Sequence, residues 1–194
     1  DFDRLSIEEG LSQSIVEQMT QDRTGFMWFA TEDGLNRFDG YTFTVYKTVP
    51  GDPSSLSHNE LKSICTDRSG ALWVGTFGGG LNRFDPATET ATRFDHDPDD
   101  PSSLAASTVR SLLEDREGNL WVGTHGGGLD RLDPATGGFL HHRHDPSDPA
   151  SLGNDDVRAL FQDRTGALWV GTNGGGLDRL DPGTGRFTHF RHDP

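Results

Sequence analysis

The sequence predicts an all-β protein, a β-propeller with four four-stranded antiparallel blades. Four tryptophans recur at intervals of 45, 48 and 48 residues, and the segments around the last three share the form LWVGTxGGGLxRxD. The chain of 194 residues also contains 25 glycines and 10 prolines, a composition that favours short strands joined by turns. A period of about 40–50 residues around an apolar Trp-containing strand is typical of propeller blades.

The third repeat illustrates the four strands that are expected in every blade. Each strand is a short run of residues, and Gly, Pro or Asp residues mark the turns between the runs. The strands expected in this repeat cover residues 108–114, 119–124, 129–133 and 138–143. Their order along the chain predicts an antiparallel β-meander.

Repetition of this pattern divides the chain into four predicted blades that follow a short leading segment. Residues 1–8 are expected to form an orphan outer strand, because FDRLS at residues 2–6 resembles the last strand of a blade. The predicted blades cover residues 9–50, 51–98, 99–146 and 147–194. Since the orphan strand has no partner in this chain, we expect an open arc of a larger ring, or a ring completed by association of several copies.

The charge balance and the cysteine count exclude several kinds of partner and site. The chain has 17 Lys and Arg residues against 31 Asp and Glu residues, and its formal net charge of −14 makes nucleic acid an unsuitable partner. No apolar run approaches the roughly 20 residues that cross a membrane, so no membrane contact by this segment is expected. The single Cys65 excludes an internal disulfide. Because the histidines lack zinc-site spacing, neither a metal nor a cofactor is expected.

Several repeated motifs are expected to be structural. The Asp of each Asp-Arg-x-Gly turn is expected to accept hydrogen bonds from turn N–H groups, and the Trp of each second strand is expected in the core. The Arg of each third strand is expected to pair with repeated Asp residues. The triple-glycine runs join two strands and lack the Lys and helix of a phosphate loop, so they favour close backbone packing.

A first set of candidate ligand-binding residues lies in the loop between the second and third strands. The residue before each glycine run changes from blade to blade, although its neighbours hardly change. In a four-stranded blade this loop lies on the same side as the connector between blades, where propellers commonly bind ligands. The candidates in this set are Glu32, Asp33, Phe77, His125 and Asn173.

A second set of candidates precedes the first strand of each blade. The first strand is innermost in a propeller, so these residues are expected near the central channel. Their amides, hydroxyls, carboxylate and imidazole suit the hydroxyl groups of sugars, and ordinary loop solvation is the alternative for each. The candidates in this set are His58, Asn59, Ser107, Asn154 and Asp155.

The pattern D-R-x-G-x-L-W-V-G-T-x-G-G-G-L-x-R-[FL]-D-P and the DPxDPxSL connectors at residues 97–104 and 145–152 resemble the two-component regulator propeller repeat. That resemblance implies the N-terminal part of the periplasmic sensor of a bacterial hybrid histidine kinase. It implies a location on the periplasmic or extracellular face of an inner-membrane receptor. It further implies an oligosaccharide ligand.

The resulting expectation is a non-catalytic, ligand-sensing propeller segment of a signalling receptor. One alternative is a self-associating interaction scaffold, a homo-oligomer formed through exposed blade edges. A polysaccharide lyase or glycoside hydrolase propeller is a further alternative, since the fold admits enzymes. A glycosidase needs two carboxylates about 5–10 Å apart across one site, and the sequence shows no such pair.

Overall fold

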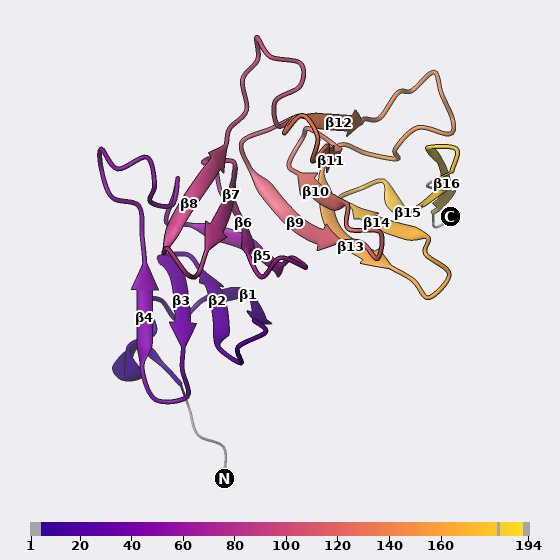
Figure 1. The fold of residues 1–194 in the computed structure, drawn as a ribbon. Helices are drawn as coiled ribbons and strands as arrows, with labels where there is room; N and C mark the ends of the chain where they lie inside the picture. The colour runs from indigo at the N-terminus through magenta and orange to yellow at the C-terminus, as the bar shows by residue number, and fades with distance from the viewer. Residues whose placement is uncertain (1–4, 182, 192–194) are drawn as a thin grey trace. The chain divides into compact units, whose positions relative to one another are not determined.

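The computed structural model describes residues 5–181 and 183–191, and this part of the chain forms four antiparallel sheets of four strands (Figure 1). In each sheet the strands are neighbours in chain order, so every sheet is a meander. The chain divides into two compact units, Asp1–Phe94 and Asp95–Pro194, with two sheets in each. The predicted all-β propeller fold with four-stranded blades is therefore confirmed.

The first unit contains the first two blades. The strands of blade 1 are β1 (Val16–Gln21), β2 (Met27–Thr31), β3 (Gly34–Phe38) and β4 (Phe43–Tyr46). The strands of blade 2 are β5 (Leu61–Thr66), β6 (Leu72–Thr76), β7 (Leu81–Asp85) and β8 (Thr90–Phe94). The strand β6 is buried along its whole length, as expected for a strand that lies between two other strands and contacts apolar side chains.

The second unit contains blades 3 and 4. The strands of blade 3 are β9 (Val109–Glu114), β10 (Leu120–Thr124), β11 (Leu129–Leu132) and β12 (Phe139–His142). The strands of blade 4 are β13 (Val157–Gln162), β14 (Leu168–Thr172), β15 (Gly176–Asp181) and β16 (Arg186–Phe190). The four strands predicted for the third repeat are thus present, and the observed strands are each one or two residues shorter.

The predicted orphan strand is wrong over the residues that the structure describes, and residues 1–4 of the prediction lie outside them. Leu5 and Ser6 belong to no strand, and Ile7–Glu9 forms a single 3-10 turn. The Ser6 hydroxyl accepts a hydrogen bond from the Glu8 amide, and the Glu9 carboxylate accepts one from the Ser6 amide at 2.7 Å. This capping box is a local helix-start signal, and it accounts for the single turn at Ile7–Glu9.

The repeated tryptophans lie between adjacent blades, as predicted. Trp28 is fully buried and packs edge-on against Phe84 of the next blade, with ring centroids 5.8 Å apart. Trp121 belongs to the buried cluster of the second unit, together with Leu168, Leu180 and other apolar residues of blade 4. Trp28 and Trp121 thus each contribute one large ring to a core shared with the following blade of the same unit, whereas Trp169 in blade 4 is half-buried.

The Asp of each Asp-Arg-x-Gly turn joins the turn to this core. In blade 3 the Asp115 carboxylate accepts hydrogen bonds from the Glu117 and Asn119 amides at 3.0 and 2.8 Å. Its other oxygen accepts the indole N–H of Trp121 at 2.8 Å. Hydrogen bonding outweighs burial, so the pKa of Asp115 lies below its usual value. The same indole bond recurs from Trp28 to Asp22, from Trp73 to Asp67 and from Trp169 to Asp163.

The triple-glycine runs bring backbone segments into close approach, as predicted. A Cβ on Gly127 would lie 2.7 Å from the Thr124 hydroxyl and 2.9 Å from Ala105. Gly128 has a φ of +87°, a conformation that L side chains rarely adopt. Only glycine therefore fits this turn between β10 and β11 without displacing its neighbours.

The prediction that the third-strand arginines pair with repeated Asp residues holds only at Arg83 within the described part of the chain. Arg83 Nε lies 3.7 Å from Asp67 Oδ2. In all four blades the guanidinium lies over the ring of the repeated Trp, at 5.7 to 6.0 Å from its centroid. The reason is register, because the Arg and the Trp are directly opposite each other on neighbouring strands.

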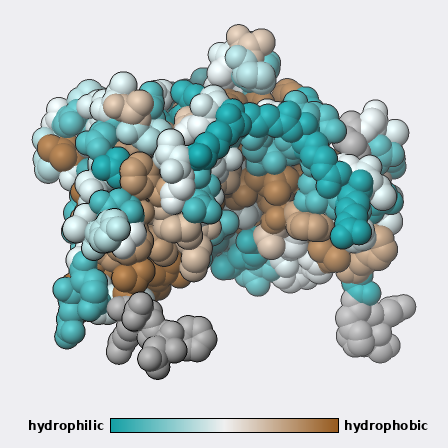
Figure 2. Space-filling view, turned by 60° about the horizontal axis from the view of Figure 1, so that its bottom comes forward, coloured by the Kyte–Doolittle hydropathy of each residue, from teal (hydrophilic) through white to brown (hydrophobic). Residues whose placement is uncertain are grey.

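Several large apolar side chains are exposed in each unit. Met19 on β1 is 58% exposed, and Phe161 on β13 is 63% exposed. Figure 2 shows hydrophobic residues at the surface beside hydrophilic segments. Within the described residues there is no helix that is long and apolar enough to cross a membrane.

Candidate ligand-binding site

The two predicted sets of candidate residues meet at one end of each blade. The amide of the residue before each glycine run donates a hydrogen bond to the carbonyl that precedes the first strand of the same blade. These bonds join Phe77 to Glu60 at 2.9 Å, His125 to Thr108 at 2.9 Å and Asn173 to Asp156 at 2.8 Å. The variable loops and the blade entries therefore form one surface within each unit.

In the first unit this surface carries a cluster of charged side chains around Lys62, the Lys62 cluster. The Lys62 amine on β5 lies 2.6 Å from the Glu17 carboxylate, 2.9 Å from Glu60 and 3.2 Å from Glu32. It also lies 5.9 Å from the centroid of the Phe77 ring, which is 44% exposed. Blades 1 and 2 both contribute, since Glu17 and Glu32 belong to blade 1.

Lys62 is held in its charged form by this arrangement. Its side chain is only 12% exposed, and burial by itself favours the neutral amine. Hydrogen bonds from the amine to Glu17, Glu60 and Glu32 outweigh burial and raise the pKa of Lys62 above its usual value. Three carboxylates share one ammonium group, so the cluster carries an excess of negative charge and of hydrogen-bond acceptors.

In the second unit the equivalent surface carries a different set of side chains around Asp156, the Asp156 cluster. The Asp156 carboxylate lies 2.8 Å from Arg158 Nη2 and 2.9 Å from Asn173 Nδ2. His125 Nδ1 reaches it from blade 3 at 3.0 Å. The His125 side chain is 52% exposed, whereas Asp156 is 12% exposed, so the cluster has a buried centre and an open rim.

Asp156 remains ionised well into the acidic range. Burial raises its pKa, but hydrogen bonds from Arg158, His125 and Asn173 outweigh burial and lower the pKa to about 2. The carboxylate therefore acts as a fixed acceptor that orients three donors from two blades. These donors have remaining N–H groups and partly exposed side chains, which suits hydrogen bonding to a polar, uncharged ligand.

The two clusters are built at equivalent positions of the repeat. Lys62 and Arg158 are each the second residue of the first strand of their blade, and Glu60 and Asp156 stand directly before that strand. The loop residues also correspond, because Glu32 and His125 come from the preceding blade. One scaffold thus presents different chemistry in each unit, while the surrounding strands keep the same register.

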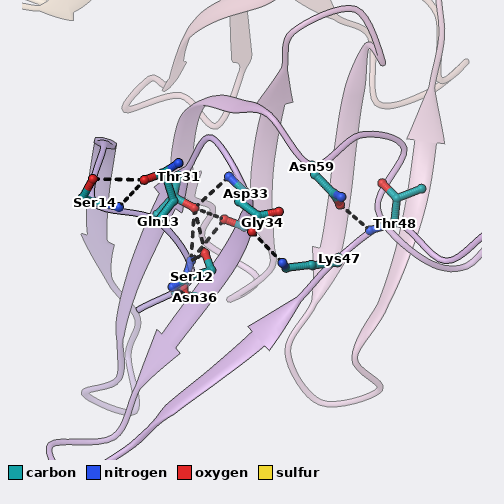
Figure 3. A network of polar contacts seen from close by, with 10 residues as sticks. All are labelled: Ser12, Gln13, Ser14, Thr31, Asp33, Gly34, Asn36, Lys47, Thr48 and Asn59. Atoms are coloured by element: carbon teal, nitrogen blue, oxygen red, sulfur yellow. Dashed lines mark hydrogen bonds and ion pairs between the residues drawn. The ribbon is translucent and has the colours of Figure 1, made fainter. Parts of the chain in front are cut away.

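Two candidates from the sequence, shown in Figure 3, are chain neighbours of Glu32 and Glu60 in the Lys62 cluster. Asp33 pairs with the Lys47 amine at 2.7 Å, and both side chains are about two-fifths exposed. The Asn59 side-chain oxygen accepts the Thr48 amide at 2.8 Å, and the Asn59 carbonyl accepts the Gly34 amide at 2.8 Å. Asn59 therefore holds the connector between blades 1 and 2 in place through hydrogen bonds, whereas the side chain of Asp33 is accessible to a ligand.

The remaining second-set candidates form hydrogen bonds within the chain or lie at half-buried positions. The Asp155 carboxylate accepts the His144 amide at 2.7 Å, and its carbonyl accepts the Gly128 amide at 2.9 Å. Side-chain atoms of His58 and Asn154 accept the amides of Glu60 and Asp156 at 3.0 and 2.8 Å. Ser107 is half-buried. A role in shaping the blade entry accounts for the bonds of Asp155, His58 and Asn154.

Sequence reasoning missed the residues at the centre of each cluster, namely Glu17, Glu60, Lys62, Asp156 and Arg158. The sequence does contain a signal, because the second residue of each first strand is charged in an otherwise largely apolar or small-residue strand. These residues are Glu17, Lys62, Arg110 and Arg158. The partners that reach Lys62 and Asp156 from the neighbouring blade are 30 to 45 residues away along the chain, and spacing within one repeat does not reveal them.

The repeats match a known family at three places. Residues 55–78, 103–126 and 151–174 match the family described as two component regulator propeller. Each matched segment runs from the blade entry through the first two strands to the first glycine of the run, so the three segments contain all the predicted candidates except Glu32 and Asp33.

The chain is similar to the extracellular domain of a putative two-component system and to a histidine kinase. The extracellular domain of a putative hybrid two component system from B. thetaiotaomicron is 36% identical, with a TM-score of 0.87 over 98% of this chain and 26% of that chain. Histidine kinase P4 of Formosa agariphila is 51% identical over 49 residues, which are 25% of this chain and 4% of that protein. This chain thus spans only a small part of both relatives.

A more distant similarity concerns the fold alone. Virginiamycin B lyase from Staphylococcus aureus, in a catalytically inactive form with quinupristin, is 16% identical, with a TM-score of 0.69 over 95% of this chain and 58% of that chain. The sequence motifs and the three matched segments agree with the four meander blades and their repeated Trp–Asp contacts. The chain contains three repeats that match the two component regulator propeller family.

Proposed function

We propose that this chain is a segment of a non-catalytic sensor propeller on the extracellular or periplasmic side of a two-component receptor. Its ligand is an oligosaccharide that binds at the Lys62 and Asp156 clusters. The observation that carries the proposal is the pair of clusters, in which a constant scaffold presents different polar side chains at equivalent positions. The similarity to the extracellular domain of a putative hybrid two component system supports it.

The chemistry of the clusters suits recognition of hydroxyl groups. The Lys62 cluster supplies carboxylate acceptors beside the exposed Phe77 ring, a combination that suits the polar edge and apolar face of a sugar. The Asp156 cluster supplies amide, guanidinium and imidazole donors. A bound ligand that favours one arrangement of the receptor shifts its signalling equilibrium, and no bond in the ligand needs to be broken.

Oligosaccharide binding by the 194-residue chain tests this proposal. We expect the chain to bind at least one member of a glycan array, and we expect His125→Ala combined with Asn173→Ala to weaken that binding about tenfold or more. Thr136→Ala, in the exposed turn between β11 and β12 at the other end of the blade, is the matched control and retains binding. Chromatography of the incubated ligand is expected to show no cleavage products.

Two results would overturn the proposal. The first is binding that is as strong in the double variant, in Phe77→Ala and in Glu32→Gln as it is in Thr136→Ala. That result would exclude both the Asp156 cluster and the Lys62 cluster as the binding site. Appearance of shortened or unsaturated products would show that the propeller is an enzyme of the lyase or hydrolase kind.

Self-association is a second candidate function, and the exposed apolar face of blade 4 favours it. Phe161 is 63% exposed, whereas Leu113, at the same position of blade 3, packs against the core cluster of the second unit. Leu177 is 40% exposed, and its equivalent Leu129 is fully buried. A second copy of this chain would remove this apolar face from water.

A further inference from the structure

A groove between blades 3 and 4 lies at the opposite end of the strands from the Asp156 cluster. It has a volume of about 620 Å³ and is bordered by the turns that follow β9 and β13. A smaller hollow of about 310 Å³ adjoins it, because Trp121, Arg131 and Leu180 line both. Of these three side chains, Arg131 is the one that can hydrogen-bond to a ligand, because the indole N–H of Trp121 already binds Asp115.

Arg131 forms no direct ion pair in the described part of the chain, although its charge is close enough to Asp133 to help lower the pKa of that carboxyl. Over residues 5–181 and 183–191 its guanidinium forms no ion pair and no hydrogen bond, and it lies 5.7 Å from the centroid of the Trp121 ring. His142, which lines the smaller hollow, packs its ring against Trp121 and Phe187. Within the same residues its ring nitrogens also lack a hydrogen-bond partner.

The first unit shows what this arrangement of side chains holds. Arg37 and Tyr46 of blade 1 occupy the positions of Arg131 and His142, as their strand registers show. Between them lies the Glu89 carboxylate of blade 2, 3.5 Å from Arg37 Nη1 and 2.7 Å from the Tyr46 hydroxyl, which donates to it. The equivalent place in the first unit is therefore filled by a carboxylate from the chain itself.

Glycine replaces that carboxylate in the second unit. Glu89 and Gly185 occupy the same turn position, since each amide donates to the carbonyl of the Asp four residues earlier, Asp85 and Asp181, at 2.8 Å. Both have a left-handed backbone, with φ values of 57° and 70°. Glu89 adopts this conformation although a non-glycine residue rarely does, and a Cβ on Gly185 would meet nothing within 4 Å.

The acidic residues of the groove do not neutralise Arg131. The Asp115 carboxylate accepts turn amides and the Trp121 indole, the Asp181 carboxylate accepts the Gly183 amide at 2.9 Å, and Glu117 accepts the Gln162 amide at 3.2 Å. The Asn119 side-chain oxygen and the Thr188 hydroxyl also line the groove, and no other described residue hydrogen-bonds to either. The groove thus combines two guanidinium groups that form no ion pair within the described residues, those of Arg131 and Arg179, with groups that suit hydroxyls.

From this comparison we propose that the groove is a second ligand site, which binds a uronate-containing oligosaccharide. The ligand carboxylate takes the place that Glu89 holds in the first unit and accepts hydrogen bonds from Arg131 and His142. The sugar hydroxyls face Asn119 and Thr188. This site goes beyond the proposed function, because it lies at the other end of the blades from the Asp156 cluster and depends on none of its residues.

Substitutions at Gly185 test the proposal without disturbing the core. Gly185→Glu restores the internal carboxylate that Glu89 supplies in the first unit, so we expect it to occupy Arg131 and to weaken ligand binding about tenfold or more. Gly185→Ala is the matched control, which adds a side chain without charge and retains binding. Arg131→Gln is expected to weaken binding to the same degree as Gly185→Glu.

The probes are a panel of uronate trisaccharides, each paired with its neutral counterpart, and calorimetry on the 194-residue chain is the measurement. We expect a uronate trisaccharide to bind the unaltered chain and its neutral counterpart to bind at least about tenfold more weakly. Equal binding of the pair, equal binding to the Gly185→Glu and Gly185→Ala variants, or no binding of any uronate in the millimolar range would each overturn the proposal. The double variant of His125 and Asn173 leaves uronate binding at this groove intact, so the two proposals fail independently.

Discussion

A single residue change decides whether two equivalent positions in this protein are filled or open. Glu89 and Gly185 share a backbone conformation, yet Glu89 supplies a carboxylate to Arg37 and Tyr46, whereas Gly185 supplies none to Arg131. The four turn aspartates illustrate the opposite case, because each accepts the indole N–H of the Trp six residues later. Constant residues of the repeat therefore build the blades, and its variable residues differ in what they present.

The repeated Trp is expected to be the strongest single contributor to the core of each interface between blades. We predict that Trp121→Ala lowers the free energy of unfolding by about 3–5 kcal/mol, because the ring is 4% exposed and packs against blade 4. Trp169→Ala is the matched control with a smaller loss, since Trp169 is only half-buried. Urea unfolding measures both, and a loss below about 1 kcal/mol for Trp121→Ala would contradict a core role.

Adjacent blades of one unit are joined by charged side chains as well as by the apolar core. Lys62 on β5 contacts Glu17 on β1, and His125 beyond β10 contacts Asp156 before β13. In both cases the chain positions are more than 30 residues apart, and the contact exists only when two blades pack side by side. The candidate site is therefore a property of a pair of blades rather than of one meander.

Removal of Lys62 is expected to weaken the contact between blades 1 and 2. We predict that Lys62→Met lowers the free energy of unfolding by about 1–3 kcal/mol, because it leaves three carboxylates together without their shared cation. Lys47→Met breaks an exposed pair with Asp33 and is expected to change stability by less than about 1 kcal/mol. Chemical unfolding of both variants checks this difference, and equal losses would contradict it.

At the scale of the whole molecule the chain consists of two units with their own cores. The core of the first unit contains Trp28, Leu72 and Phe84, and that of the second contains Trp121, Leu168 and Phe187. Blade 4 also presents the exposed side chains of Phe161, Leu177 and Phe190. Apolar side chains gathered on one blade favour association because they are then removed from water.

Self-association through blade 4 is expected to make the solution mass depend on concentration. We predict that light scattering of the 194-residue chain detects a dimer whose fraction rises with concentration. Phe161→Glu is expected to reduce that fraction, because it places a charge on the apolar face. Tyr41→Glu, at a residue that is 91% exposed, is the control without effect. A strictly monomeric chain at high concentration would contradict this prediction.

Repeat period and turn residues were sufficient to predict the blades, the strands of the third repeat to within one or two residues, and the buried Trp. They failed at residues 5–8 of the predicted orphan strand, where Ser6 and Glu9 form a capping box. They also located the loop of Phe77, His125 and Asn173, and the hydrogen bonds to the blade entries confirm that both candidate sets lie together. Ligand binding by these residues stays a prediction.

The sequence by itself determined the meander of each blade, because strand length, turn chemistry and the Trp period are local and recur in every repeat. Only the tertiary structure decided which side chains meet. The contacts of Lys62 with its carboxylates and of His125 with Asp156 each join two blades. The position that Glu89 fills in the first unit, and that is open at Gly185 in the second, also lies between two blades. The physical reason is that packing one meander on the next fixes these distances, and no spacing within a repeat encodes them.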